Sequence, residues 1–147
     1  MASREEISLQ DMQALAEFRY NIRRFLRASE EILRAEGLKP QQYQLMLAIK
    51  GMPESTPSTI SQVAERLQLQ HHSTVELTDR LATRGLVKRK RAAEDRRQVI
   101  LELTPKGEKL LRDMAALHRD ELRSTGPALV TALRKVLSGS AAAKDKS

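Results

Sequence analysis

Residues 84–107 read RGLVKRKRAAEDRRQVILELTPKG, a pattern typical of a helix end followed by a β-hairpin. Gly85 comes after an apolar-periodic segment and can adopt the left-handed backbone conformation that ends a helix. The apolar residues that define one face of the returning arm are Val99, Leu101 and Leu103. Alternation of this kind is the period of a strand with one face toward a core. We therefore expect a hairpin whose loop, residues 91–97, is too charged to be buried.

Most of the excess positive charge of the chain lies on this hairpin. Residues 84–97 contain seven basic side chains and two acidic ones, a net charge of +5, whereas the whole chain carries +7. A concentrated basic projection is the electrostatic signature of a protein that binds the nucleic-acid backbone. Lysines also protect exposed sheet edges, but that protection needs one or two charges rather than a cluster at a loop. The charge pattern therefore favours a hairpin that binds nucleic acid.

The composition predicts one ordinary folded domain. With 147 residues, of which 40% are hydrophobic and 31% charged, the chain is long enough for one core and too short for two large domains. No apolar run is as long as a membrane span, and the first ten residues lack a signal-peptide core, so we expect a cytoplasmic protein. The absence of cysteine excludes disulfides, thiol nucleophiles and cysteine metal sites. Aromatic residues make up only 3%, which argues against stacking of single-stranded bases.

Helices are predicted on both sides of the hairpin. Residues 9–35 keep the three-four apolar spacing of a long amphipathic helix, and Pro40 begins a second helix that ends at Gly51. Residues 59–69 have the pattern of a short helix capped by Thr59, and residues 69–71 form a turn into the next helix. In that helix we expect four residues to face the core: Val75, Thr78, Leu81 and Ala82. The polar residues at its start are then left to face outward.

A further helical segment follows the hairpin. Thr104 has the position of an N-cap and Pro105 that of a first-turn residue. Gly126 and Pro127 predict a break between two C-terminal helices, and the apolar period ends before residues 139–147. The expected organisation is an N-terminal helix in residues 1–37, a DNA-binding domain in residues 38–104, C-terminal helices in residues 105–138, and a flexible tail in residues 139–147.

Two short helices, a tight turn and a basic hairpin together make a winged helix-turn-helix. The wing contains Asp95-Arg96-Arg97, and Leu103-Thr104-Pro105-Lys106-Gly107 follows it; these resemble the Asp-x-Arg and Leu-Thr-x-x-Gly motifs of the MarR family of bacterial transcriptional regulators. Asp79-Arg80-Leu81, Arg84-Gly85-Leu86-Val87 and the segment of residues 38–47 add to the resemblance, which covers the chain up to the tail. The fold class is therefore expected to be mainly α with a small β-hairpin wing, a winged helix-turn-helix joined to a helical dimerisation domain.

The resemblance implies a sequence-specific regulator of transcription, a repressor, that acts as a homodimer on palindromic double-stranded DNA. The N- and C-terminal helices of both chains would form the dimerisation domain. The residues point the same way, because residues 9–35 and 110–137 present more apolar helix face than one small winged helix can cover. The alternative is a winged helix that binds protein or structured RNA within a larger assembly, which sequence-specific binding to duplex DNA would exclude.

Base contacts belong at the start of the second short helix, because the N-terminal end of a recognition helix enters the major groove. The expected DNA-binding residues are Gln70, His71, His72, Ser73, Thr74, Arg80, Lys88, Arg89, Lys90, Asp95, Arg96 and Arg97. We assign His72, Ser73 and Thr74 to sequence reading. We assign Lys88, Lys90 and Arg96 mostly to phosphates. The resemblance further implies that Asp95 pairs with Arg89 or Arg97, so that Arg97 enters the minor groove.

Other sites are weighed against this interpretation. The resemblance implies a small aromatic or anionic effector between the dimer helices and the winged helix, where the candidate residues are Tyr20, Arg23, Arg24, Tyr43, Met46 and His118. His72 and Glu76 stand four apart and could bind a metal, but a third ligand is not evident, so we expect no metal and no cofactor. The sequence has no Gly-rich phosphate loop, no nucleophile with a positioned base and no paired catalytic carboxylates, which predicts that the protein is not an enzyme.

Overall fold

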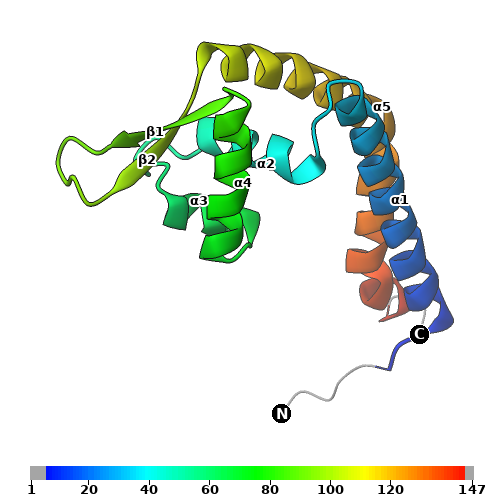
Figure 1. The fold of residues 1–147 in the computed structure, drawn as a ribbon. Coiled ribbons are helices and arrows are strands. Elements are labelled where there is room, and N and C mark those ends of the chain that lie inside the picture. The colour runs from blue at the N-terminus through cyan, green and yellow to red at the C-terminus, as the bar shows by residue number, and fades with distance from the viewer. Residues whose placement is uncertain (1–5, 145–147) are drawn as a thin grey trace. The chain divides into compact units, whose positions relative to one another are not determined.

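A computed structural model of the protein describes residues 6–144, with side chains described as far as residue 138. The elements in chain order are α1 (Leu9–Arg34), α2 (Pro40–Lys50), α3 (Ile60–Leu67), α4 (His71–Thr83), β1 (Val87–Arg91), β2 (Val99–Leu103) and α5 (Pro105–Lys144) (Figure 1). The protein is mostly helical, and its two strands form an antiparallel hairpin, so the expected fold class is confirmed. Among the described residues, no helix combines the length and apolar character needed to cross a bilayer.

The chain divides into two compact units. One consists of the residues up to Glu31 together with those from Leu117 onward, and the other is Ile32–Ala116. This division lies inside α1 and α5 rather than at the expected boundaries after residues 37 and 104. The reason is packing, because Leu111 and Met114, in the first turns of α5, belong to the hydrophobic core of the second unit.

The second unit is a winged helix. Helices α2, α3 and α4 and the hairpin surround one core, to which α1 contributes its last turn through Leu33. Its fully buried side chains, each less than 2% exposed, include Leu33, Leu45, Met46, Val63, Leu81, Leu86 and Leu101. Burying a side chain of this size stabilises a fold by about 1.5–3 kcal/mol relative to leaving it exposed. The core therefore brings α4 and the base of the hairpin together in one compact unit.

Local signals set the ends of these helices much as the sequence predicts. The Thr59 hydroxyl accepts from the Gln62 backbone N–H at 3.2 Å and caps α3, and the Thr104 hydroxyl accepts from the Gly107 N–H at 3.0 Å and caps α5. Gly85 has a φ of +73°, so the expected left-handed end of α4 is confirmed. The turn before α4 comprises residues 68–70 rather than the expected 69–71, because α3 already ends at Leu67 and His71 already belongs to α4.

The hairpin is anchored along both edges of β2. Its register pairs Val87 with Leu103 and Arg91 with Val99, so Arg91 ends β1 and the connecting loop begins one residue later than expected. On the other edge of β2, the backbone of Leu101 donates to the Ser58 carbonyl at 2.8 Å, and the Ser58 hydroxyl donates to the Leu101 carbonyl at 2.7 Å. These bonds hold the middle of β2 against the loop that precedes α3.

The first unit consists of most of α1 and the second part of α5, which run side by side in Figure 1. At the start of α1 the Ser8 N–H donates to the Asp11 carboxylate at 2.9 Å and holds its pKa below the usual value. Inside the unit, the Ser29 hydroxyl lies 2.6 Å from Nε2 of the buried His118. Many large apolar side chains of these helices remain exposed, including Leu9, Met12, Leu15, Leu26, Leu122, Val130, Leu133 and Leu137.

The break expected at Gly126 and Pro127 is wrong, because α5 continues through both residues to Lys144. A proline removes one backbone hydrogen bond and costs about 3 kcal/mol inside a helix. Packing against α1 continues past this point: Pro127 lines a shared hollow with Asn21, and Ala132 is only 2% exposed. Contacts on both sides of the proline therefore outweigh its local preference. The tail expected from residue 139 begins within this helix, and residues 145–147 lie outside the described part.

Candidate nucleic-acid interface

The start of α4 presents a row of polar side chains to solvent. His71 and His72, in the first helical turn, are exposed, as are the preceding Gln70 and, two turns further on, Arg80; Ser73 is half-buried. The first turn of a helix leaves backbone N–H groups without helical partners. An exposed helix start with hydrogen-bonding side chains has the shape and chemistry to enter a groove of duplex DNA.

Thr74 does not belong to this exposed row. The sequence places it at the entry of the helix, free to face outward, but its side chain is 0% exposed and its hydroxyl donates to the Gln70 carbonyl at 3.0 Å. Thr78, one turn later, is equally buried and donates to the Thr74 carbonyl at 2.7 Å. The placement of Thr74 is therefore corrected. Because the Thr74 hydroxyl bonds a backbone carbonyl of the preceding helical turn, this polar side chain packs in the core with its hydrogen bond satisfied.

The wing has two chemically different faces. Lys88 and Lys90 project from one face of β1, and both lie near Glu102 of β2, with nitrogen to oxygen distances of 3.7 and 3.8 Å. Their side chains are 57% and 66% exposed, so one carboxylate partly balances two solvated ammonium groups. Ion pairs this exposed contribute at most about 1 kcal/mol each to stability. Both lysines remain available to an anionic partner.

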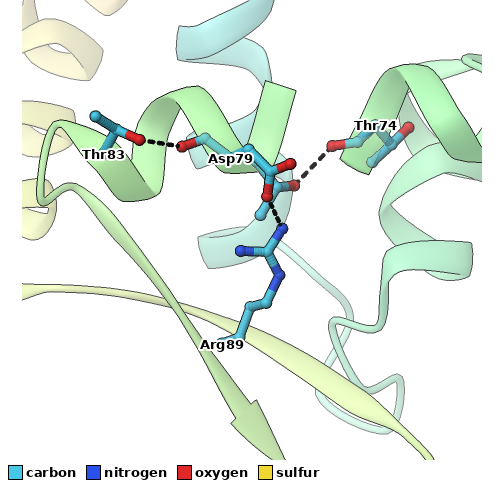
Figure 2. A network of polar contacts seen from close by, with 5 residues as sticks. Thr74, Asp79, Thr83 and Arg89 are labelled. Carbon is cyan, nitrogen blue, oxygen red and sulfur yellow. Dashed lines mark hydrogen bonds and ion pairs between the residues drawn. The ribbon is translucent and has the colours of Figure 1, made fainter. Parts of the chain in front are cut away.

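Arg89 lies on the opposite face of β1, so its side chain points away from those of Lys88 and Lys90. Its guanidinium pairs with the Asp79 carboxylate of α4, as Figure 2 shows. Figure 2 also shows the Thr83 hydroxyl on the Asp79 backbone carbonyl, a bond of 3.0 Å. Of the two partners expected for Asp95, Arg89 or Arg97, Arg89 is therefore not the one, because strand alternation turns it toward α4 and away from the loop.

Asp95 shapes the loop through the backbone instead. Its carboxylate accepts from the Arg97 backbone N–H at 3.0 Å, which is the geometry of an Asx-turn. Across the loop, the Arg91 guanidinium donates to the Arg96 carbonyl at 2.8 Å. The side chains of Arg96 and Arg97 are exposed. Asp95 thus orders the loop as expected, but by a bond to the peptide of Arg97 rather than to its guanidinium.

Arg84, which the sequence counts within the basic cluster, has an internal role. Its guanidinium donates to the carbonyls of Gly37 at 3.0 Å and Glu36 at 3.3 Å. These carbonyls lie beyond the last turn of α1, far away in sequence. The cationic surface of the wing is therefore smaller than the charge count suggests and is centred on Lys88, Lys90, Arg96 and Arg97.

Comparison with known proteins agrees with this geometry. Residues 36–98, from the loop after α1 to the end of the wing loop, match the family model of the MarR family. The expected resemblance to the MarR family is confirmed over this segment. The matched segment contains every element of the exposed surface described above, from α4 to the loop between the strands.

The individual proteins that this chain resembles are distant from it in sequence. It is 28% identical over 93 residues to YsmB of Bacillus subtilis (strain 168), described as an uncharacterized HTH-type transcriptional regulator, over 63% of this chain and 62% of YsmB. AbsC, a MarR family transcriptional regulator from Streptomyces coelicolor, has a similar fold, with a TM-score of 0.74 and 20% identity over 98% of this chain and all of AbsC. A mutant of MarR from E. coli, solved in complex with operator DNA, has a TM-score of 0.63 and 21% identity over 81% of this chain and 89% of that one.

The structure provides no third ligand for the metal site that His72 and Glu76 could form, as far as its described residues show. His72 and Glu76 are both exposed on α4, and among the described residues no group of three or more His, Cys, Asp and Glu side chains is placed to hold a metal ion. The expectation of no metal site stays a prediction.

The residues proposed for an effector pocket are divided between the two units. Arg24 lies over the ring of the exposed Tyr20, 5.6 Å from its centroid, on α1, near the exposed Arg23. His118 is buried in the same unit. Tyr43 and Met46 lie in the core of the winged helix, where burial raises the pKa of the Tyr43 phenol. Their role in binding a ligand stays a prediction.

The sequence pattern did not predict the roles of two residues. The first is Asp79, which the sequence names only as part of the Asp79-Arg80-Leu81 resemblance and which is the partner of Arg89. The second is Ser58, in a loop, which holds β2 through its backbone and its hydroxyl. Strand alternation could have separated Arg89 from Lys88 and Lys90, but no local signal names the partners across the fold.

Proposed function

We propose that this protein is a sequence-specific transcriptional regulator that binds double-stranded DNA as a homodimer in the cytoplasm. One observation carries the proposal: the exposed start of α4 and the exposed cations of the wing belong to one compact unit with a common core. A helix start supplies base contacts and a basic hairpin supplies backbone contacts, so a unit with both can read a duplex. The operator complex of the structurally similar E. coli MarR mutant supports the same function here.

The residues divide by chemistry within this proposal. Gln70, His71, His72 and Ser73 carry donors and acceptors at the helix start and read base edges. Lys88, Lys90 and Arg96 contact phosphates, and Arg97 reaches the minor groove from the loop that Asp95 orders. Thr74 is left out of the reading set because it is buried. Arg80, exposed on the same helix, contributes a further backbone contact.

The proposal of a homodimer rests on the uncovered apolar surface of α1 and α5. Leu9 is 68% exposed and Leu137 74%, and further large apolar side chains lie exposed between them on the same helices. Contiguous apolar surface on helices usually marks an interface, and a second copy of the same chain supplies a matching one. A two-fold dimer carries two recognition helices, so the operator is a pseudo-palindrome with half-sites about one helical turn apart.

The first experiment selects binding sequences from random duplexes and measures affinity against salt. We expect a two-fold symmetric motif, and affinity that falls steeply as salt rises because phosphate contacts release counterions. His72→Ala should alter the selected motif, whereas Lys88→Ala should weaken all duplexes about equally. Binding indifferent to sequence, or a preference for structured RNA or a protein, would favour the alternative of a module within a larger assembly.

Two finer parts of the proposal have their own measurements. Sedimentation at micromolar protein should give twice the chain mass, and a stable folded monomer would contradict the dimer. Repression, relieved by a small aromatic or anionic effector, is proposed from the family resemblance. A reporter behind the selected operator should lose expression when the protein is present, and rising expression would identify an activator instead.

A further inference from the structure

The wing cations differ in how far they are covered. The Arg89 side chain is 37% exposed, compared with 57% for Lys88 and 66% for Lys90. Arg89 shares its face of the hairpin with Val87, which is 2% exposed, and stands opposite Leu101, which is 1% exposed. Side chains alternate along a strand, so Arg89 cannot point outward together with the two lysines. It therefore faces the body of the winged helix.

Its partner lies on the proposed recognition helix. Asp79 follows His72 by seven residues, which is about two helical turns, so the two side chains are on the same side of α4. An unpaired carboxylate at this place would repel the phosphates of a bound duplex. The Arg89 guanidinium, bonded to this carboxylate, cancels that charge (Figure 2). The same pair joins β1 to α4, whereas the Ser58 bonds hold the other strand, β2.

We propose that the Asp79–Arg89 ion pair fixes the wing relative to α4 before DNA binds, and that Arg89 is a positioning residue rather than a phosphate contact. The inference rests on the proposed DNA-binding function and refines it, because the sequence places Arg89 among the residues that touch DNA. A wing held in place loses less conformational freedom on binding. Asp79, although acidic, then strengthens binding to a polyanion.

The sign of the effect at Asp79 provides the sharpest test. If Asp79 were only a negative charge near phosphate, Asp79→Ala would tighten binding to the selected operator duplex. If it positions the wing, Asp79→Ala should weaken binding by about 3- to 10-fold at fixed salt. Glu76→Ala is the matched control, since Glu76 is an exposed acid three residues earlier on the same helix, and it should bind at least as well as the parent. Unchanged or tighter binding by Asp79→Ala overturns the proposal.

Arg89 is tested by salt dependence and by exchange of the pair. A lost phosphate contact lowers the slope of log affinity against log salt by about 0.9, whereas a lost positioning residue leaves the slope unchanged. We expect Arg89→Ala to weaken binding with the parent slope. The double variant Asp79→Arg with Arg89→Asp should recover most of the affinity that each single change loses. A reduced slope, or no recovery, contradicts the positioning role.

A measurement without DNA separates this inference from the proposed function. Heteronuclear NOE values for the backbone of residues 92–98 should fall in Asp79→Ala and Arg89→Ala and remain at the parent level in Glu76→Ala. Melting temperatures should stay within a few degrees of the parent, because the pair is exposed. A parent protein that binds no duplex defeats the proposed function, whereas a loop that stays equally ordered in both variants defeats the role of the ion pair.

Discussion

Gly107, in the first turns of α5, provides a sharp test of how the winged helix is packed. A Cβ atom added at this position would lie 2.0 Å from the backbone oxygen of Leu86 and 3.0 Å from its carbonyl carbon. Both neighbours are backbone atoms that no rotamer change can move. We therefore predict that Gly107→Ala destabilises the protein, although alanine is normally the better helix former.

The magnitude follows from three terms. Replacing glycine by alanine inside a helix usually gains about 1 kcal/mol. Against this, forcing a methyl group into a packed site costs about 1–3 kcal/mol. Separating α5 from Leu86 also strains two bonds at Thr104, from its N–H to the Leu86 carbonyl at 3.1 Å and from its hydroxyl to the Gly85 carbonyl at 2.6 Å. Each bond is worth about 0.5–1.5 kcal/mol, so the net loss is about 1–5 kcal/mol.

The assay is thermal unfolding followed by circular dichroism, with all variants at one protomer concentration because oligomers melt in a concentration-dependent way. For a chain of this length the expected loss lowers the melting temperature by roughly 2–20 °C. Lys109→Ala is the matched control: it also places alanine in the first turns of α5, and the Lys109 side chain is 84% exposed and pairs with Asp113 at 3.9 Å. It should stay within about 0.5 kcal/mol of the parent. Gly107→Ala melting at or above the parent temperature would refute the reasoning.

Three further predictions concern the interface. Thr74→Val removes a buried donor to the Gln70 carbonyl, so it should lower the free energy of unfolding by about 0.5–1.5 kcal/mol and leave the selected DNA motif unchanged. An altered motif would show that Thr74 takes part in reading bases. Asp95→Asn keeps an oxygen that can accept from the Arg97 N–H and loses a negative charge, so operator affinity should stay equal or rise. Asp95→Ala should weaken operator binding, because the turn is lost. Equal operator titration curves for the two variants would contradict this role of the Asp95 carboxylate. Glu102→Gln removes the carboxylate between Lys88 and Lys90. Binding should therefore tighten for all duplexes by similar factors, with a steeper salt dependence. A gain in affinity confined to one DNA sequence would contradict the assignment of both lysines to phosphates.

The sequence by itself determined the elements whose signals are local. Pro40 begins α2 where a ring with fixed φ is tolerated, Thr104 caps α5, and Gly85 takes the positive φ that ends α4. The alternation of Leu101 and Leu103 identified the buried face of the wing. Each of these signals acts over a few residues, so the helix and strand order of the winged helix follows without knowledge of contacts. The exposed helix start and the charged hairpin follow in the same way.

Only the tertiary structure decided which groups meet. Packing against α1 carries α5 through Pro127, although the local preference is for a break. Thr74 is polar in sequence and lies in the core, because its hydroxyl bonds its own helix. Arg84 bonds carbonyls 47 and 48 residues away, and Arg89 finds Asp79 rather than Asp95. Charge and periodicity report what a side chain can do, but its partner depends on contacts between segments far apart in sequence, which one chain's local pattern does not encode.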